Sequence, residues 1–143
     1  MKILFVCSGN TCRSPMAQAV FKKIAADRNL NVECRSAGIA AFTGSPASDN
    51  SVAALNEIGI DLSDFRSTSI TSLIPQLNEF DLFVPMTYSH AMALLQLGVE
   101  KKKIYLFDTD VSDPYGGDLS VYRATRDELL KKLDTLAEFV EKY

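Results

Sequence analysis

The sequence predicts a single α/β domain over residues 1–143, built on a parallel sheet of four strands with helices on its faces. Four short apolar runs alternate with helical patterns, which is typical of strands joined by crossover helices. The first run, KILFV, is almost wholly apolar, as expected of a strand that is buried on both faces. The composition, 47% apolar and 23% charged residues, suits one well-buried core, and no linker or repeat divides the 143 residues.

A turn and a helix follow the first strand. Gly9 and Asn10 form the turn signal, and Pro15, which follows Ser14, suits the first helical turn because its missing N–H has no partner there. The apolar residues of this helix repeat every four positions: Met16, Val20 and Ile24. This period predicts one buried helix face.

The next strand and helix are bounded by turn residues. VECRSA predicts the second strand, which Gly38 ends. After the loop FTGSPASDN, Ser48 or Asp49 can cap a helix through SVAALNEI. We expect this helix to end at Gly59, because glycine is the residue type that most often follows a helix.

The second half of the chain continues the alternation. DLFVPM is the third apolar run, and its Pro85 predicts that pairing ends there because proline has no N–H to donate. SHAMALLQL predicts a helix that ends at Gly98, and KIYLF predicts the fourth strand. A long acidic loop, DTDVSDPYGGD, leads to the last helix. This helix carries one apolar stripe: Tyr122, Leu129, Leu133, Leu136 and Val140.

Composition and charge argue against several classes of function. The 15 basic and 18 acidic residues give a net charge of −3, so the chain lacks the basic surface of a nucleic-acid-binding protein. No apolar run has the length of a membrane span, and MKILFVCSGN lacks the features of a signal peptide. We therefore expect a cytoplasmic protein with reduced thiols and no nucleic-acid or membrane partner. Three cysteines and one histidine show no zinc-binding spacing, so no metal site is expected.

The segment between the first strand and the first helix has the pattern C-x5-R, from Cys7 to Arg13. Its backbone N–H groups can turn inward beside a helix N-terminus and bind an oxyanion. Gly9 and Asn10 are residue types that tolerate left-handed backbone. Arg13 adds a planar fork for two phosphate oxygens, and the positive field favours the nucleophilic thiolate of Cys7. The predicted phosphate-binding loop comprises Ser8, Gly9, Asn10, Thr11 and Cys12.

Catalysis by Cys7 competes with a simpler interpretation, in which Cys7 and Cys12 are small buried hydrophobic residues. A C-x5-R pattern alone is a weak signal. A strand before it, a glycine inside it and Ser-Pro after it favour the catalytic interpretation. Ser14 can donate a hydrogen bond to the thiolate, and the two glycine-rich nucleotide motifs are absent.

A cysteine that accepts a phosphoryl group needs an acid that protonates the leaving group. His90 is a candidate by residue type, but its place in a helical pattern favours an exposed or helix-end histidine. Asp113, before Pro114, follows the last strand and shares the sheet edge of Cys7, since parallel strands bind ligands beyond their carboxyl ends. Asp118 is better placed to cap the last helix. Asp113 is therefore the predicted acid.

With C-x5-R-S-P after the first strand, SAG at 36–38 and Asp-Pro before the last helix, the chain resembles the low-molecular-weight protein tyrosine phosphatase family over its whole length. The resemblance implies a twisted four-stranded parallel sheet with flanking helices, no cofactor, and a phosphorylated protein as substrate. It also implies that Cys7 forms a phosphocysteine and that Arg13 binds the phosphoryl oxygens. Asp113 would protonate the leaving group and then activate water. The implied supporting residues are Asn10, Ser14 and Ser36, in a protein that is a monomer or self-associates weakly.

Two departures from the tyrosine-specific members concern the substrate. Thr11 stands where these members usually carry isoleucine or leucine, and DPYGGD holds one aromatic residue, Tyr115, where they commonly have two. Both features resemble the bacterial protein arginine phosphatase branch. The Thr11 hydroxyl can accept a hydrogen bond from a guanidinium, although it can also bond within its own loop. We therefore favour phosphoarginine over phosphotyrosine, with Phe42 and Tyr115 as expected rim residues.

The second thiol of the loop has two interpretations, which stay open. By resemblance to the family, an oxidant would convert Cys7 to a sulfenic acid that Cys12 traps as a disulfide. Cys12 could equally be a packing residue at the start of the helix. Cys34 lies inside the second strand and is expected in the core.

Three other functions fit parts of this pattern. Arsenate reductases on this fold use further cysteines far from the loop, where this chain has only Cys34. A sugar-transport phosphocarrier also uses a strand-end cysteine but does not need Arg13 together with Asp113. A non-catalytic phosphate-binding module is the alternative of a different class, and it predicts that loss of Asp113 leaves function intact.

Overall fold

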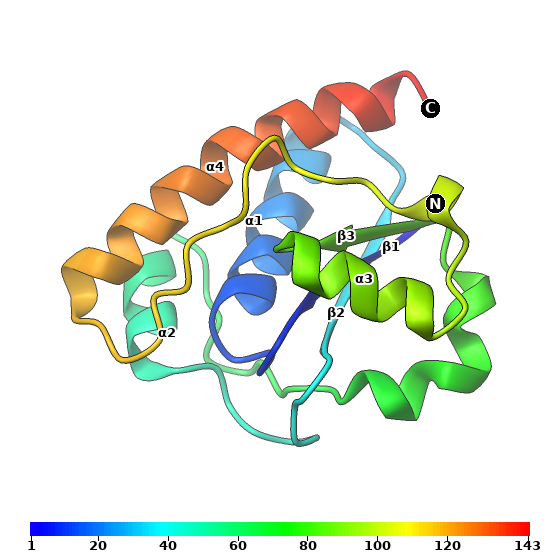
Figure 1. The fold of residues 1–143 in the computed structure, drawn as a ribbon. Helices are drawn as coiled ribbons and strands as arrows, with labels where there is room; N and C mark the ends of the chain where they lie inside the picture. The colour runs from blue at the N-terminus through cyan, green and yellow to red at the C-terminus, as the bar shows by residue number, and fades with distance from the viewer.

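The computed structural model describes residues 1–143 and shows a parallel sheet of three strands (Figure 1). β1 (Lys2–Cys7) lies in the middle, between β2 (Glu33–Gly38) and β3 (Leu82–Pro85). Cys7 aligns with Gly38, and Val6 aligns with Pro85. The carboxyl ends of the three strands therefore meet at one edge, where the predicted site lies.

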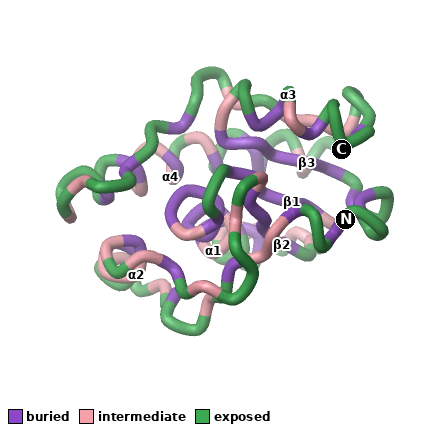
Figure 2. The backbone as a smooth tube through the Cα atoms, turned by 60° about the horizontal axis from the view of Figure 1, so that its bottom comes forward, coloured by how far each residue is buried: buried purple, intermediate pink, exposed green.

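Helices cover both faces of the sheet (Figures 1 and 2). Side chains alternate along β1, so Ile3 and Phe5 face one layer and Leu4 and Val6 face the other. The first layer holds α1 (Arg13–Asp27), α2 (Asp49–Asn56) and α4 (Leu119–Glu141). The second layer holds the 3-10 helix η1 (Ile70–Glu79) and α3 (Tyr88–Gln96). Figure 2 shows buried residues concentrated in the strands and on the inner sides of the helices.

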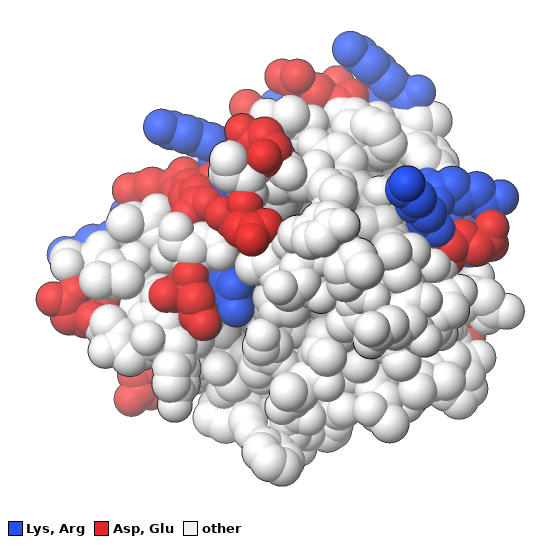
Figure 3. All heavy atoms as spheres, viewed as in Figure 1, with Lys and Arg blue, Asp and Glu red and all other residues white.

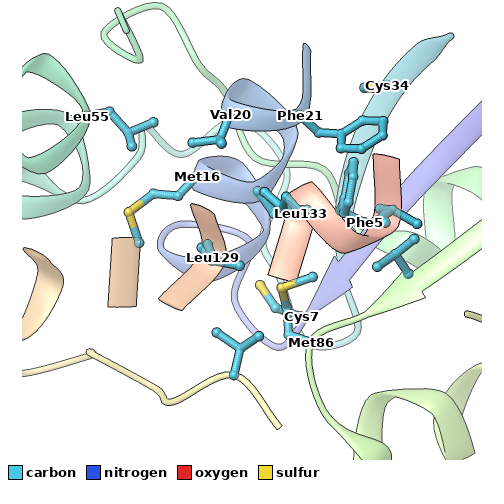
Figure 4. Packing of buried hydrophobic residues seen from close by; sticks show 14 of the residues in the cluster. Phe5, Cys7, Met16, Val20, Phe21, Cys34, Leu55, Met86, Leu129 and Leu133 are labelled. Carbon is cyan, nitrogen blue, oxygen red and sulfur yellow. The ribbon is translucent and has the colours of Figure 1, made fainter. Parts of the chain in front are cut away.

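The larger core packs α1 and α4 against β1 (Figure 4). The rings of Phe5 and Phe21 lie 5.8 Å apart between their centroids. Four residues of the predicted α4 stripe are buried: Tyr122, Leu129, Leu133 and Leu136. Cys7 belongs to the same core, beside Met86 in Figure 4, so the base of the predicted site is continuous with the larger hydrophobic core.

The prediction of a fourth strand at KIYLF was wrong. Only Ile104 forms a bridge, with Phe83, and the Tyr105 N–H donates to the Phe83 carbonyl at 2.9 Å. The next donor on that side of β3 would be residue 85, because strand residues alternate the direction of their N–H groups. Pro85 has no N–H, so pairing stops after one bridge. The residues before the bridge form a short 3-10 helix, η2 (Lys101–Lys103).

Helix ends largely follow the predicted signals. The Ser48 side chain caps α2, and the Asp118 side chain caps α4 by accepting from the Val121 N–H at 3.2 Å. Gly59 and Gly98 follow α2 and α3 with φ values of 78° and 92°, which favour glycine. The sequence patterns did not predict η1. None of the helices combines the length and apolar character needed to cross a bilayer.

Candidate active site

The loop from Cys7 to Arg13 connects the end of β1 to the start of α1 and forms most of a pocket of about 250 Å³. Two residues of the distant acidic loop, Asp113 and Tyr115, complete its wall. The structure therefore brings together the two segments that the topology predicted at one sheet edge.

The Cys7 sulfur is buried at the base of this pocket and is held by hydrogen bonds. The Asn10 backbone N–H donates to Sγ at 3.2 Å, and the Ser14 hydroxyl lies 2.8 Å from Sγ. Because the Ser14 oxygen already accepts a bond from the Asn10 side-chain amide at 2.7 Å, its own proton is free to be donated to the sulfur. Two donors at the sulfur stabilise its anionic form.

Asn10 braces the loop from inside. It is fully buried, with φ at 55°, in the left-handed region that asparagine tolerates better than most residues. Its side chain donates to the Ser36 hydroxyl at 3.0 Å and accepts from the Thr68 N–H at 2.8 Å. Of the two residues that tolerate left-handed backbone, Asn10 adopts it and Gly9 does not.

The hydrogen-bond network around Asn10 extends to a residue that was not predicted from the sequence. The Ser36 hydroxyl donates to Gln18 Oε1 at 2.6 Å, and the Gln18 amide donates to the Cys34 carbonyl at 3.3 Å. Gln18 lies on α1, and the periodicity of that helix contained no signal for this contact. Cys34 is buried in β2, and burial raises the pKa of its thiol to about 12, as suits a core residue.

Gly38 has a steric reason to be a glycine. A Cβ atom at this position would lie 2.5 Å from the Ser8 carbonyl oxygen and 3.0 Å from the Asn10 nitrogen. The end of β2 therefore passes so close to the phosphate-binding loop that no side chain fits. The bond from the Ile39 N–H to the Cys7 carbonyl, at 2.9 Å, holds the two segments together.

Arg13 and Asp113 contact each other in the wall of the pocket. An Arg13 terminal nitrogen lies 3.5 Å from Asp113 Oδ2, and the Arg13 side chain is 8% exposed whereas that of Asp113 is 56% exposed. Arg13 also donates to the Val111 carbonyl at 3.3 Å, and the Tyr115 N–H donates to Asp113 Oδ1 at 3.1 Å. The guanidinium is thus fixed beneath a carboxylate that solvent and substrate can reach.

Thr11 and Cys12 occupy the outer part of the loop. The nearest partner of the Thr11 hydroxyl is the Cys12 sulfur, at 3.8 Å, which is a weak contact. Cys12 also lies 3.3 Å from the Tyr122 hydroxyl and 3.4 Å from the Ser48 hydroxyl. All three cysteines are free thiols, and Cys7 and Cys12 line the same pocket.

His90 was expected to be an exposed or helix-end histidine, and it is a helix-end residue that is buried. It lies near the start of α3, only 6% exposed, with Nε2 2.8 Å from the Ser8 hydroxyl and Nδ1 3.0 Å from the Thr87 hydroxyl. Burial, and secondarily the charge of Arg13, lower its pKa to about 4. The topology of the sheet could have predicted this contact. The start of α3 follows the carboxyl end of β3, so it lies at the same edge of the sheet as Cys7.

The two expected rim residues differ in their positions. Tyr115 lines the pocket and is 80% exposed, whereas Phe42 is 85% exposed and does not contribute to the pocket wall. Figure 3 shows acidic side chains gathered over α4 and the loop before it, and a broad surface without charge over α3 and η1. The sequence agrees, since 36–48, 67–78 and 82–99 contain no Lys, Arg, Asp or Glu.

A larger hollow, of about 720 Å³, lies between 105–108 and α4, away from these residues. Of its two lysines, Lys131 and Lys132, the second donates to the Asp108 carboxylate and to both oxygens of Thr109. This hollow contains no cysteine, so it offers no nucleophile of the kind found at Cys7.

Comparison with known proteins matches residues 2–143 to the model of low molecular weight phosphotyrosine protein phosphatase. A protein-arginine-phosphatase of Bacillus subtilis is 40% identical, over 99% of this chain and 98% of its own length. A low molecular weight protein-tyrosine-phosphatase PtpB of Staphylococcus haemolyticus is 31% identical, over 91% and 93%.

Two solved structures resemble this one over nearly their whole length. The YwlE arginine phosphatase, in a mutant with a phosphorylated active-site serine, has a TM-score of 0.90 at 40% identity, over 99% of this chain and 97% of that one. A low molecular weight protein tyrosine phosphatase of T. tengcongensis has a TM-score of 0.89 at 40% identity, over 96% and 98%.

Proposed function

The chain belongs to the low molecular weight phosphotyrosine protein phosphatase family, and on that premise we propose that it hydrolyses phosphoarginine in proteins. Membership makes it a protein phosphatase, with arginine and tyrosine phosphatases among its relatives. The substrate and the roles of individual residues form the proposal.

The proposed reaction has two steps. The Cys7 thiolate attacks phosphorus while the guanidinium of Arg13 and the loop N–H groups bind the phosphoryl oxygens. Asp113 gives its proton to the departing nitrogen, and a phosphocysteine remains. Asp113, now a carboxylate, takes a proton from a water that attacks the phosphocysteine, and inorganic phosphate leaves as the Cys7 thiolate is restored.

The geometry around the sulfur supports these roles. Hydrogen bonds from Asn10 and Ser14 stabilise the thiolate both as nucleophile and as leaving group. Asp113 is the exposed carboxylate of the pocket, and it lies 3.5 Å from Arg13. A phosphoryl group bound by that guanidinium would therefore lie beside the carboxyl, which supports the acid role. The serine-substituted YwlE structure carries its phosphate on the active-site serine, which supports the same attachment point at Cys7.

The observation that carries phosphoarginine is the Thr11 hydroxyl. It lies in the pocket wall, and its only protein partner is a sulfur atom at 3.8 Å. A guanidinium has N–H donors that must find acceptors when water is excluded, and this hydroxyl can accept one of them. Pockets that match a polar substrate group can discriminate strongly against analogues without it.

The test compares Thr11→Ile with wild type on phosphoarginine and phosphotyrosine peptides of the same sequence. We expect wild type to prefer phosphoarginine in kcat/KM and Thr11→Ile to shift that ratio at least about fivefold towards phosphotyrosine, since one buried hydrogen bond contributes on the order of 1 kcal/mol or more. Thr11→Val, which removes only the hydroxyl, separates polarity from size. A wild-type preference for phosphotyrosine, or an unchanged ratio in Thr11→Ile, contradicts the proposal.

A tyrosine phosphatase of the same mechanism is the second candidate, favoured by Tyr115 at the pocket mouth. This ring is 80% exposed and could stack on a phenyl group. The same peptide pair decides between the two substrates. A non-catalytic binding module is tested by p-nitrophenyl phosphate, which reduced wild type should hydrolyse and Cys7→Ser should not.

A further inference from the structure

Both ring nitrogens of His90 make hydrogen bonds, one to the phosphate-binding loop and the other to the N-cap residue of α3. Nε2 lies 2.8 Å from the hydroxyl of Ser8, the residue directly after the proposed nucleophile, and Nδ1 lies 3.0 Å from the hydroxyl of Thr87. His90 is 6% exposed, whereas Ser8 is exposed and lines the pocket. The imidazole therefore stands behind a hydroxyl that substrate can reach.

The protonation of the ring follows from its surroundings. Burial and the charge of Arg13 lower the pKa of His90 to about 4, so the imidazole is neutral at neutral pH and carries one N–H. A neutral ring can donate one hydrogen bond and accept another. The neutral ring can therefore hold the Ser8 hydroxyl beside the proposed phosphate site without adding a charge there.

A ring proton on Nε2 gives both ring nitrogens a complementary hydroxyl partner. The Thr87 oxygen already accepts from the backbone N–H of His90 at 3.2 Å, as the cap of α3. With the ring proton on Nε2, the Thr87 hydroxyl donates its own proton to Nδ1. Nε2–H consequently donates to the Ser8 oxygen, and the Ser8 O–H remains free to donate into the pocket.

We propose that His90 is a positioning residue, which holds the Ser8 hydroxyl so that its O–H donates to a phosphoryl oxygen of the substrate during transfer. This inference rests on the phosphoryl-transfer function proposed above but not on the choice between arginine and tyrosine. The donor would act on the phosphoryl group, which both substrates share. Ser8 would add to the donors from Arg13 and the loop backbone on a group whose charge is spread over its oxygens.

A matched pair of amides tests the proposal. His90→Gln places an amide at the distance of Nε2 and can keep the bond to Ser8. His90→Asn reaches only as far as Nδ1, so it can keep the contact to Thr87 and must lose the bond to Ser8. Ser8→Ala removes the hydroxyl itself. Steady-state kinetics on p-nitrophenyl phosphate and on a phosphoarginine peptide, with thermal unfolding in parallel, supply the measurements.

We expect Ser8→Ala and His90→Asn each to lower kcat/KM roughly tenfold to thirtyfold, the effect of losing a hydrogen bond to a charged group. The double variant should be no worse than either single variant, because both remove the same interaction. His90→Gln should recover most of the lost rate. The loss should be similar for both substrates and should appear in kcat, while melting temperature changes little in Ser8→Ala.

Three results would overturn the proposal: additive losses in the double variant, equal losses in His90→Gln and His90→Asn, or full activity of Ser8→Ala. If His90→Asn fails to fold, the test is the kcat/KM of Ser8→Ala compared with that of Ser8→Thr, which keeps a hydroxyl at this position. If reduced wild type hydrolyses neither substrate, the proposed function itself fails. Binding of inorganic phosphate to wild type, Ser8→Ala and His90→Gln then still measures whether Ser8 is a phosphate donor.

Discussion

At the scale of single residues, hydrogen-bond direction decides chemistry in this pocket. Ser14 can donate to the Cys7 sulfur because Asn10 already occupies its acceptor side. The same reasoning gives Ser8 a free proton and leaves the Thr11 oxygen open to a substrate donor. A serine or threonine thus acts as donor or acceptor according to its neighbours.

Asp113→Ala should lower kcat on a phosphoarginine peptide by about 10² to 10⁴, the usual contribution of a general acid–base group. The loss should be smaller on p-nitrophenyl phosphate, whose leaving group needs little protonation. Asp118→Ala is the matched control from the same loop. Because Asp118 only caps α4, this variant should lose about 1 kcal/mol of stability and keep its rate. Equal rates of wild type and Asp113→Ala on the phosphopeptide would refute the acid role.

Cys12→Ser tests the role of the second thiol. Cys7 and Cys12 line one pocket as free thiols, which makes Cys12 a candidate for resolving oxidised Cys7. We expect wild type to regain activity when peroxide treatment is followed by a thiol, and Cys12→Ser to regain much less. Cys34→Ser, with its buried and weakly acidic thiol replaced, should recover like wild type. Equal recovery of all three proteins would leave Cys12 a packing residue.

At the scale of elements, the ends of strands and helices position the site. The end of β1 carries Cys7, the first turn of α1 carries Arg13 and Ser14, and the end of β2 supplies Ser36 and Gly38. Helix patterns and caps were predictable from local sequence, because capping and periodicity are local effects. The fourth strand is missing because the Pro85 nitrogen faces the side of β3 on which that strand would pair. A local sequence pattern does not predict which side a strand nitrogen faces.

Gly38→Ala should damage both stability and activity. Its Cβ would lie 2.5 Å from the Ser8 carbonyl oxygen and 2.6 Å from the Ala41 Cβ, so the loop or β2 must move. We expect a loss of roughly 1–3 kcal/mol in the free energy of unfolding, as for an overpacked core, and a clear fall in kcat/KM. Gly59→Ala, which strains a φ of 78° far from the pocket, should lose stability only. Urea unfolding and steady-state kinetics measure the two effects, and unchanged kinetics in Gly38→Ala would contradict this account.

At the scale of the whole molecule, the two layers are joined through the pocket as well as through the sheet. His90 belongs to the layer of α3 and η1, while Arg13 begins α1 in the opposite layer. The hydrogen bond between His90 and Ser8 joins α3, in one layer, to the loop that leads into α1, in the other layer. Stability and the geometry of the site should therefore respond together to the state of this single histidine.

Acid should destabilise the protein through His90. Burial lowers its folded pKa to about 4, with Arg13 adding to this effect and Asp110 and Asp113 partly opposing it, whereas an unfolded histidine titrates near 6.5. Between these values the unfolded chain binds more protons, so this contribution to stability is full above about pH 6.5 and falls as the pH drops towards 4. The total loss is on the order of 3 kcal/mol.

His90→Gln isolates this contribution, since the chain has one histidine. Urea unfolding at pH 7 and pH 4.5 should show a smaller loss of stability on acidification in the variant than in wild type. The comparison uses the change between the two pH values, so a general destabilisation by the substitution cancels. The same loss in both proteins would show that the buried imidazole does not control acid stability.

The α/β class, most helix ends and the meeting of the Cys7–Arg13 loop with Asp113 at one edge were predictable from the sequence, because they follow from local periodicity, turn chemistry and the shared edge of parallel strands. The three-stranded sheet, the contact of Gln18 with Ser36 and the burial of His90 behind Ser8 became visible only in the folded chain. Each of these three features depends on the direction in which a backbone N–H or a helix side chain points towards a segment that is distant in the sequence. Side-chain direction at such contacts is set by packing across the whole molecule, and no local stretch of sequence encodes it.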